Sequence, residues 1–356
     1  METEIIKLLV PAILAFIVGI AITPAITHFL YKHEMWKKKA GKGTGYGGGG
    51  TPIFDQLHKE KDTNTPRMGG LVIWVALLIT IVLLAGLDFL FPNSLVGQLD
   101  FLSRSQTWIP LFTLLVGAVV GFLDDYLEVK GLGKHFAGGL PLSQRMLVVL
   151  LTSSFIAWWF YEKLEVSSIS FFMETIELGV WFIPFFLLVS VCIYMSSVID
   201  GIDGLSGGVF VFIFGAYTFI AFSQSQFDLA AFCAALVGAT LAFLWFNVPP
   251  ARFYMTETGV MALTMTITVV AFMTDTLGDG EGLTVLPIIG FLLVATVAGN
   301  TIQILSKKLL GRKVFLVAPI HHHFEALGWP GHKVTMRYWI IGLICAVIGI
   351  VIAAAI

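Results

Sequence analysis

Ten apolar segments run through the chain, and each has about the 20 residues that an α-helix needs to cross a lipid bilayer. Hydrophobic residues make up 57% of the sequence and charged residues 12%, against roughly 45–50% and about 25% in soluble domains. The sequence therefore predicts an all-α, polytopic integral membrane protein with about ten transmembrane helices, in one domain over residues 1–356. The predicted segments are 5–30, 69–91, 107–123, 144–161, 178–197, 205–223, 228–246, 258–275, 284–306 and 337–356.

The distribution of lysine and arginine predicts the orientation of these helices. Of the 21 basic residues, 18 lie in or at the edges of the loops that follow the odd-numbered segments. Because loops rich in Lys and Arg stay in the cytoplasm, we expect both termini on the opposite, periplasmic side. The net charge of −2 gives no reason to expect a nucleic-acid partner. The three cysteines are scattered through apolar segments and form no disulfide or metal-binding pattern.

The unusual polar motifs all fall on this predicted cytoplasmic side. Each of the five loops on that side carries at least one of them, whereas a random scatter of polar loops would not segregate in this way. We therefore expect a single active site at the membrane surface, built from several loops. The motifs are Thr65–Gly70, Gly121–Tyr126, Val198–Gly208, Phe246–Arg252, Thr256–Gly259 and Ala318–Glu325.

Two adjacent carboxylates, Asp124 and Asp125, stand where the third segment ends. Neighbouring residues on a helix point about 100° apart, so the two side chains cannot face one atom in the same way. We expect them to serve two roles, such as base or metal ligand on one side and partner of a lysine on the other. The alternative is a solvated helix end.

A second pair, Asp200 and Asp203, lies between two apolar segments and is spaced i, i+3. On a helix this spacing would place both carboxylates on one face, where they could bind Mg²⁺ or hydrogen-bond a nucleotide or sugar. The alternative is a polar turn with capping aspartates. Glu257 precedes the eighth segment and is predicted to be a further metal ligand, with Asp203. Its alternative role is that of a helix-start acid favoured by the helix dipole.

Three consecutive histidines, His321, His322 and His323, lie in the last cytoplasmic loop. Consecutive histidines do not have the i, i+4 spacing with which helical histidines chelate one metal, and no second Cys/His cluster is present. We therefore expect them to bind an anionic group such as phosphate, the alternative being a packing motif. Residues 41–50 are rich in glycine but lack the phosphate-loop spacing, so they are interpreted as a flexible linker.

Acidic residues suited to Mg²⁺, histidines and lysines suited to phosphates, and a membrane surface together favour phosphoryl transfer. In that chemistry the protein mainly positions the reacting groups and neutralises charge. A site at the membrane surface suggests that one of the substrates is a lipid phosphate.

The motifs GFLDDY, DGIDGL, WFNVPPARFYMTETG and APIHHHFEALGW resemble those of the polyprenyl-phosphate hexose-1-phosphate transferases. Within that superfamily the chain most resembles the phospho-N-acetylmuramoyl-pentapeptide transferase (MraY) family, from about Thr65 to the C-terminus. The resemblance implies transfer of phospho-MurNAc-pentapeptide from its UDP carrier to undecaprenyl phosphate, with Mg²⁺, release of UMP and formation of lipid I. It also implies a location in the bacterial cytoplasmic (inner) membrane, and the helical surface is compatible with a homodimer.

The resemblance further implies roles for individual residues. Asp124, Asp125, Asp200 and Asp203 match catalytic aspartates, and Glu257 with Asp203 would hold the metal. The three histidines are expected to contact substrate, together with Lys134 and Asn247. The chain departs from the family pattern at four positions, where the family has Lys, Asn, Asn and Asp: Glu128, Tyr194, Ser197 and Glu257.

Three other functions remain open at this stage. The first is transfer of a different sugar phosphate, such as GlcNAc-1-phosphate, by a member of the same superfamily. The second is transport, although carriers place their ionisable residues near the middle of the bilayer rather than at one edge. The third is a relative that has lost catalysis.

Overall fold

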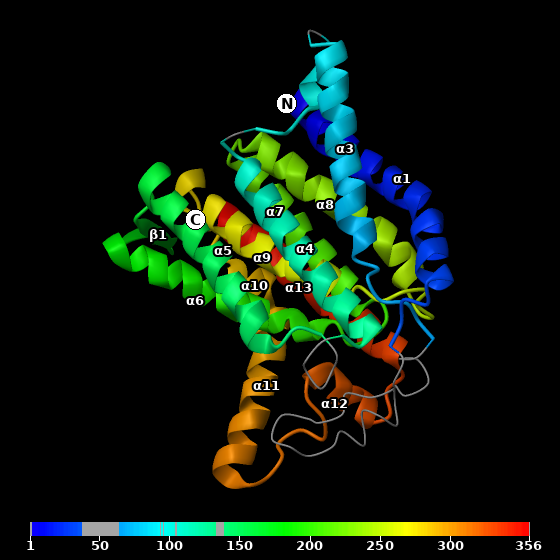
Figure 1. Ribbon diagram of the computed structural model, residues 1–356. Helices are drawn as coiled ribbons and strands as arrows, with labels where there is room; N and C mark the ends of the chain where they lie inside the picture. The colour runs from blue at the N-terminus through cyan, green and yellow to red at the C-terminus, as the bar shows by residue number, and fades with distance from the viewer. Residues whose placement is uncertain are drawn as a thin grey trace.

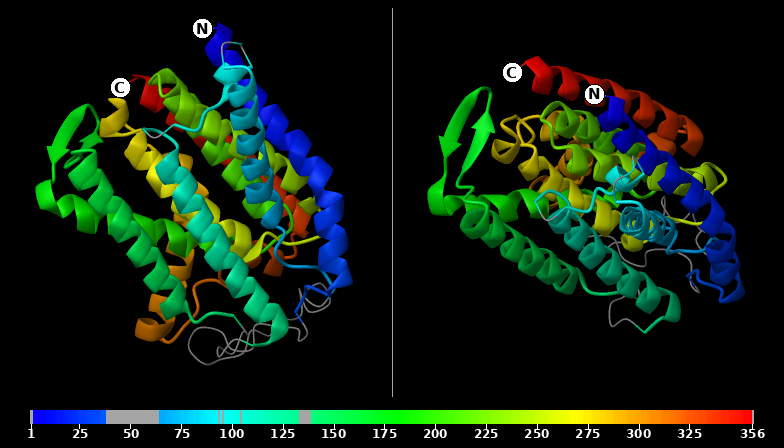
Figure 2. Two further views of the ribbon diagram at one scale, coloured as in Figure 1. Left: turned by 45° about the horizontal axis from the view of Figure 1, so that its top comes forward. Right: turned by 90° about the horizontal axis from the view of Figure 1, so that it is seen from above.

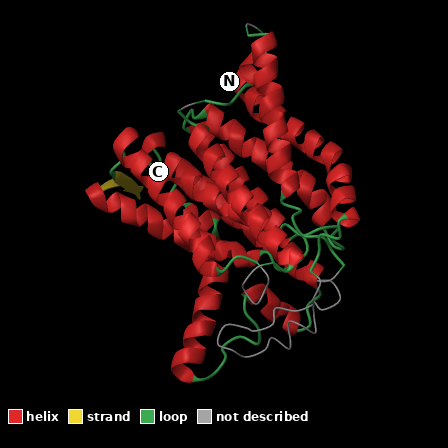
Figure 3. Ribbon diagram, in the orientation of Figure 1, coloured by secondary structure: helices red, strands yellow, loops and turns green. Residues whose placement is uncertain are grey.

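The structure is a computed structural model that describes residues 2–37, 64–92, 94, 96–103, 105–132 and 139–355. In this part of the chain the regular structure is almost entirely helical, and the strands form a two-stranded antiparallel hairpin (Figures 1 and 3). The prediction of an all-α protein is therefore confirmed, with the hairpin as an addition to it.

Ten long helices make up most of the molecule. They are α1 (Glu2–Lys32), α3 (Leu71–Leu90), α4 (Trp108–Lys130), α5 (Leu142–Lys163), α6 (Phe182–Met195), α7 (Leu205–Ser223), α8 (Phe227–Asn247), α9 (Thr256–Met273), α11 (Phe291–Leu310) and α13 (Gly331–Ala355). The short elements are α10 (Leu286–Ile289), α12 (Ile320–Ala326), the strands β1 (Ser168–Phe171) and β2 (Glu174–Glu177), and the 3₁₀ turns η1 (Gly97–Leu99), η2 (Gly179–Trp181), η3 (Ser196–Ile199) and η4 (Thr276–Gly278).

Nine of the helices within the described residues are long and apolar enough to cross a membrane. Their burial divides them into inner and outer helices. The most apolar stretch of α9 is 94% buried, whereas those of α1, α5 and α13 are only 17–22% buried. Apolar helices with so much exposed surface are stable when lipid covers them, so the chain is a multi-pass membrane protein.

Residues 284–306 do not form the single membrane-spanning helix that the sequence predicts. The chain forms the single turn of α10, breaks at Gly290 and restarts as α11. Figure 1 shows α10 within the bundle and α11 extending away from it. Two other boundaries also shift: α4 continues seven residues past 123, so that Asp124 and Asp125 lie inside the helix, and α13 begins at Gly331.

The central helix α9 is closely packed against α4 through two glycines of α4. A Cβ added at Gly121 would lie 2.1 Å from the carbonyl oxygen of Glu257, and one added at Gly117 would lie 2.7 Å from Cα of Ala262. Only glycine permits such an approach of two backbones. The contact brings the aspartate pair of α4 next to the first turn of α9.

Both chain termini lie toward one end of the bundle, and α12 lies toward the opposite end (Figures 1 and 2). The hairpin is at the periphery, beside the ends of α5 and α6. Its strands pair with Ser168 opposite Glu177 and Phe171 opposite Glu174. Its turn is held by Glu281, whose two carboxylate oxygens accept hydrogen bonds from the backbone N–H groups of Phe172 and Met173 at 3.1 and 2.7 Å.

Candidate active site

Asp125 is fully buried on α4 and joins that helix to the start of α9. Its Oδ2 accepts hydrogen bonds from Thr256 Oγ1 at 2.5 Å, Thr258 N at 2.8 Å and Thr258 Oγ1 at 2.6 Å. Its Oδ1 lies 3.4 Å from Arg67 Nη2. The carboxylate thus caps the N-terminus of α9, where the helix dipole favours negative charge. Both oxygens of Asp125 are therefore engaged by described residues, and its catalytic role stays a prediction.

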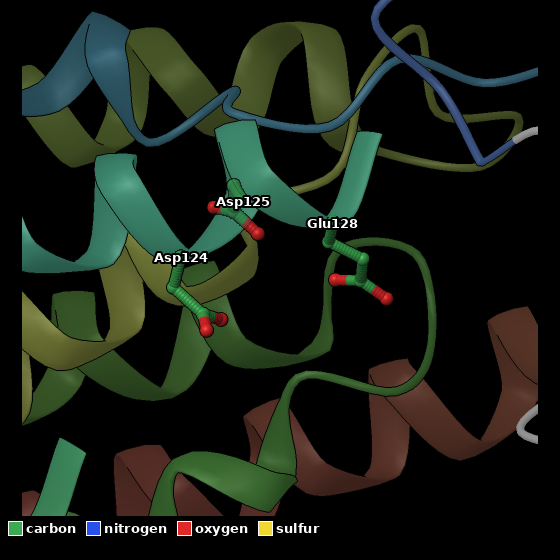
Figure 4. Close-up of side chains that lie close together, drawn as sticks. All are labelled: Asp124, Asp125 and Glu128. Carbon is green, nitrogen blue, oxygen red and sulfur yellow. The ribbon is translucent and has the colours of Figure 1, made fainter. Parts of the chain in front are cut away.

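Asp124 faces a different set of partners, as expected for neighbouring positions on a helix (Figure 4). Its Oδ1 accepts a hydrogen bond from Leu140 N at 2.6 Å, and its Oδ2 lies 3.8 Å from Arg145 Nη1. A Cβ at Gly139 would stand 2.7 Å from that Oδ1, so the chain before α5 approaches the carboxylate closely. Asp124 is 4% exposed and keeps one oxygen without a direct hydrogen bond among the described residues.

Glu128 follows one turn later on α4 and completes a group of carboxylates with Asp124 and Asp125 (Figure 4). One ligand atom from each lies within 4.8 Å of the others. Glu128 is paired with Arg67 Nη2 at 2.7 Å and with Lys37 Nζ at 2.8 Å. These two basic side chains already balance much of the negative charge on the Asp125–Glu128 side of the group.

Glu257 lies in the first turn of α9 and forms an ion pair with Arg145 in the first turn of α5. The same Nη1 atom of Arg145 is the one that lies 3.8 Å from Asp124. The guanidinium therefore stands between two carboxylates from different helices. The second oxygen of Glu257, Oε2, is buried and has no hydrogen-bond partner within the described part of the chain.

Arg145 is not among the site residues that the sequence predicts, because no motif includes it and it is there only one of the basic residues that indicate orientation. The signal that could have found it is its position, since it is the basic residue at the membrane edge of a helix that directly follows the aspartate pair. Tyr194, which is buried on α6, lies against Arg145 and Glu257. Two of the four departures from the family pattern, Tyr194 and Glu257, therefore meet at this arginine.

The prediction that Asp200 and Asp203 share a helix face is wrong, because the chain is not helical there. η3 ends at Ile199, and α7 begins only after Gly204, which has a left-handed φ of 76°. Asp200 accepts hydrogen bonds from Ser206 Oγ at 2.6 Å and Thr256 N at 2.8 Å. Burial raises the pKa of the Asp200 carboxyl, and the hydrogen bonds from Ser206 and Thr256 lower the pKa by a smaller amount.

Asp203 points elsewhere, and its Oδ2 accepts a hydrogen bond from Ala251 N at 3.2 Å. The two aspartates thus lie in a polar turn, where they accept hydrogen bonds from Ser206, Ala251 and Thr256. Their roles in catalysis and in metal binding stay predictions. Asn247 supports the same turn: its Oδ1 accepts from Gly204 N at 3.0 Å, and its Nδ2 donates to Phe253 O at 2.8 Å. Substrate contact by Asn247 stays a prediction. Lys134 and the glycine-rich residues 41–50 lie outside the described residues.

The three histidines separate in space, although they are consecutive on α12. His321 and His322 are buried, and a Cβ at Gly201 would lie 2.5 and 2.6 Å from their Nε2 atoms. Gly201 therefore lets the aspartate turn pack directly on both rings. His322 Nδ1 shares a 2.7 Å hydrogen bond with Glu325 Oε2. His323 turns away: its Nδ1 accepts a hydrogen bond from Leu316 N at 3.2 Å, and its ring lies against Phe315.

Residues far apart in the sequence thus meet at one end of the bundle. Contacts link Arg67, the aspartates of α4, the aspartate turn, the start of α9 and the histidine helix. Such a set offers carboxylates that can take a proton or hold a divalent cation, and imidazoles and guanidinium groups that can bind phosphates.

Comparisons with known proteins find a family model that matches the middle of the chain and relatives that match almost all of it. The model of glycosyl transferase family 4 matches residues 107–275. Phospho-N-acetylmuramoyl-pentapeptide-transferases of Bacillus mycoides and Bacillus anthracis are 33% identical over 358 residues, which cover 97% of this chain and of each relative. The one from Anoxybacillus flavithermus is 32% identical over 345 residues, or 95% of both chains.

Proposed function

Because the chain belongs to the phospho-N-acetylmuramoyl-pentapeptide-transferase family, we propose that it transfers phospho-MurNAc-pentapeptide from its UDP carrier to undecaprenyl phosphate. The products are UMP and lipid I, an intermediate of peptidoglycan synthesis. The observation that carries the proposal is a chain of contacts in a bundle of membrane-length helices. Arg145 joins Asp124 to Glu257 at the start of α9, and the aspartate turn joins the start of α9 to the buried His321–His322 pair. A lipid phosphate and a water-soluble nucleotide can meet only at the membrane surface.

The distribution of basic residues supports a cytoplasmic position for the end of the bundle where α12 lies, in the inner membrane of a bacterium. Both termini, which lie toward the other end (Figure 2), would then face the periplasm. A nucleotide-linked donor is made and supplied in the cytoplasm, so this orientation lets the donor reach the site without crossing the bilayer.

Asp124 is the carboxylate that would act on the lipid phosphate as base or orienter. Its Oδ2 is 3.8 Å from Arg145, the nearest cation among the described residues. That oxygen could accept a proton from the lipid phosphate while no metal ion is bound to it, whereas a metal ion held there would make Asp124 an orienter of the phosphate. Asp125 would position it by fixing α4 to α9. Direct attack by the lipid phosphate expels UMP and leaves no covalent intermediate. On an aspartyl route, Asp124 would expel UMP and carry the phospho-MurNAc-pentapeptide as an acyl phosphate that can be trapped before the lipid phosphate takes it over.

The remaining residues would bind the donor. His321 and His322, with Lys134, are placed in the proposal as contacts to the phosphates or sugar, and Asp200 and Asp203 as the groups that shape the nucleotide pocket. The support is the packing of Gly201 on both imidazole rings, which joins the aspartate turn to the histidine helix. His323 would contribute through packing, since its ring and Nδ1 are engaged by Phe315 and Leu316.

The residues present fit the Mg²⁺ that this chemistry uses. The buried Glu257 Oε2 has no hydrogen-bond partner among the described residues, and Asp124 Oδ2 faces the same guanidinium. Asp124 and Glu257 would therefore hold the ion. Asp203, the other metal ligand that the sequence predicts, has one oxygen engaged by Ala251 N. When bound, Mg²⁺ would neutralise charge on the donor diphosphate.

Release of UMP from radiolabelled donors, measured in detergent with and without Mg²⁺, tests the proposal. We expect release from UDP-MurNAc-pentapeptide, dependent on undecaprenyl phosphate and abolished by a chelator. Release of UMP only from UDP-GlcNAc would show that the donor is UDP-GlcNAc and would contradict the proposed MurNAc-pentapeptide transfer. Turnover without a sealed membrane would exclude a pure transporter, and no turnover with any donor would contradict enzymatic activity.

A further inference from the structure

The ion pair between Arg145 and Glu257 leaves polar atoms unsatisfied on both sides. Arg145 Nε and Glu257 Oε2 are each buried without a hydrogen-bond partner among the described residues, although the two side chains are bonded through Nη1 and Oε1. A guanidinium that pairs with a carboxylate as a lasting strut commonly does so through two parallel N–H···O bonds. Leaving a buried donor or acceptor without a partner is costly. The single hydrogen bond between Arg145 and Glu257 is therefore what we expect if this pairing is one of two arrangements of the site, with a different partner for each side chain in the other.

The charges around Arg145 indicate what the second arrangement contains. Asp125 and Glu128 have Arg67, and Glu128 also has Lys37. Among the described residues, Arg145 is the basic side chain that is paired with both Asp124 and Glu257. If the Arg145 side chain moved away, the buried carboxylate of Asp124 on α4 and the largely buried carboxylate of Glu257 on α9 would be left with a combined charge of −2. That is the charge that a divalent cation neutralises, and carboxylates are the ligands it prefers.

We propose that Arg145 is an exchangeable counter-ion: it occupies the space between Asp124 and Glu257 when no divalent cation is bound, and leaves it when the cation binds. This inference rests on the proposed function, because the freed guanidinium would then pair with the diphosphate of the nucleotide donor. Arg145 is suited to this exchange, since it projects from the first turn of α5 on a long side chain that is 22% exposed. It acts as a positioning residue for the cation and as a binding residue for the donor.

Two opposite effects on binding follow from this exchange. Without the cation, Arg145 competes for its ligands and weakens cation binding. With the cation, Arg145 is available to the donor, so cation and diphosphate strengthen the binding of each other. Such coupling is reciprocal by thermodynamic necessity. If the ion pair between Arg145 and Glu257 were a permanent link between α5 and α9, neither effect on binding would be seen.

The first test measures Mn²⁺ affinity by electron paramagnetic resonance on the full-length, detergent-solubilised protein without any substrate. We expect Arg145→Met to bind Mn²⁺ about tenfold more tightly than the unsubstituted protein. Lys163→Met removes one positive charge from the other end of α5 and should leave Mn²⁺ affinity unchanged. Equal or weaker Mn²⁺ binding by Arg145→Met overturns the proposal. If thermal unfolding shows that this variant does not fold, Arg145→Gln carries the same expectation.

The second test measures the affinity for UDP with and without Mg²⁺. In the unsubstituted protein Mg²⁺ should increase UDP affinity; in Arg145→Met that increase should shrink about tenfold. An unchanged increase would overturn the exchange. The two proposals fail separately: tighter Mn²⁺ binding without UMP release from any donor contradicts only the transferase function, and UMP release with unchanged Mn²⁺ binding contradicts only the exchange.

Discussion

At the scale of single residues, Asp124 and Asp125 illustrate how adjacent carboxylates of one helix can differ in purpose. Asp125 receives three hydrogen bonds from Thr256 and Thr258 and holds the start of α9. Asp124 receives one hydrogen bond and faces the cation of Arg145 with its other oxygen. Substituting each in turn should therefore affect different properties of the protein.

We expect Asp124→Asn to lower UMP release by about 10²–10⁴-fold, the usual contribution of a general base, with an unchanged unfolding temperature. Asp125→Ala should instead cost about 1–3 kcal/mol of stability or more, because the backbone N–H of Thr258 and the hydroxyl groups of Thr256 and Thr258 lose their buried acceptor. Thermal unfolding in detergent, followed by turnover at a temperature where each variant is folded, separates the two. Equal stability losses for both would contradict this division.

Gly201 is a second residue whose role follows from close contact. A methyl group there would meet the Nε2 atoms of both His321 and His322. We expect Gly201→Ala to push the histidine helix from the aspartate turn, at a cost of about 1–3 kcal/mol in stability, and to raise the KM for the donor.

The matched control is Gly215→Ala on α7, where an added Cβ would have no atom within 4 Å. An alanine in a helix interior should stabilise it by roughly 0.5–1 kcal/mol. If both alanine variants raised KM equally, packing of Gly201 on the histidines would not be the reason.

At the scale of elements, the hairpin β1–β2 shows how a buried acid can stabilise an unfavourable turn. Phe172 and Met173 have positive φ values of 49° and 69°, which are costly for bulky residues. Both oxygens of Glu281, which is 4% exposed, accept hydrogen bonds from the two N–H groups of this turn.

We expect Glu281→Ala to loosen the turn by about 1–3 kcal/mol, since two N–H groups lose their acceptor. Hydrogen exchange measured by mass spectrometry should show faster exchange of a peptide that spans Phe172 and Met173. UMP release should change little, because the hairpin and α12 lie in different parts of the molecule (Figure 1). Glu177→Ala on the exposed strand β2 is the control. Unchanged exchange in Glu281→Ala would show that the strand pairing alone holds the turn.

At the scale of the whole molecule, the exposed and buried helices form a bundle whose two ends are chemically different. The hairpin and both termini lie away from α12 (Figures 1 and 2). In the sequence, most basic residues belong to the loops that follow odd-numbered apolar segments, and the loop that contains α12 is one of these. The proposed orientation therefore assigns the hairpin to the periplasm and the loop before α12 to the cytoplasm.

Cysteine labelling in intact cells checks this orientation. After replacement of Cys192, Cys233 and Cys345, a single cysteine is introduced at Glu174 or at Lys313, both of which are exposed. A membrane-impermeant maleimide should label Glu174→Cys in intact cells and Lys313→Cys only after lysis. Labelling of Lys313→Cys in intact cells and of Glu174→Cys only after lysis would show that the bundle has the opposite orientation, with the candidate site in the periplasm.

The sequence by itself predicts most of the fold, because spans of about 20 apolar residues have few ways to satisfy their backbone in lipid other than a helix. The segment 205–223 matches α7 at both ends. The prediction of one helix over 284–306 is wrong because the length of an apolar segment does not reveal a break inside it. The break lies at Gly290, between α10 and α11. The hairpin was missed because its stability comes from Glu281, a residue about 110 positions away.

The candidate site divides in the same way. Motif chemistry predicts a site that contains Asp124, Asp125, Asp200, Asp203, Glu257 and the histidines, because ionisable groups at the edge of apolar helices are costly unless they have a function. The structure brings these motifs into contact. Only the tertiary structure decided that Asp125 caps α9, that His323 turns away, and that Arg145 stands between Asp124 and Glu257. Residue type determines which chemistry a side chain can perform, whereas its partners depend on helix packing, in which Gly117 and Gly121 bring α4 and α9 into contact.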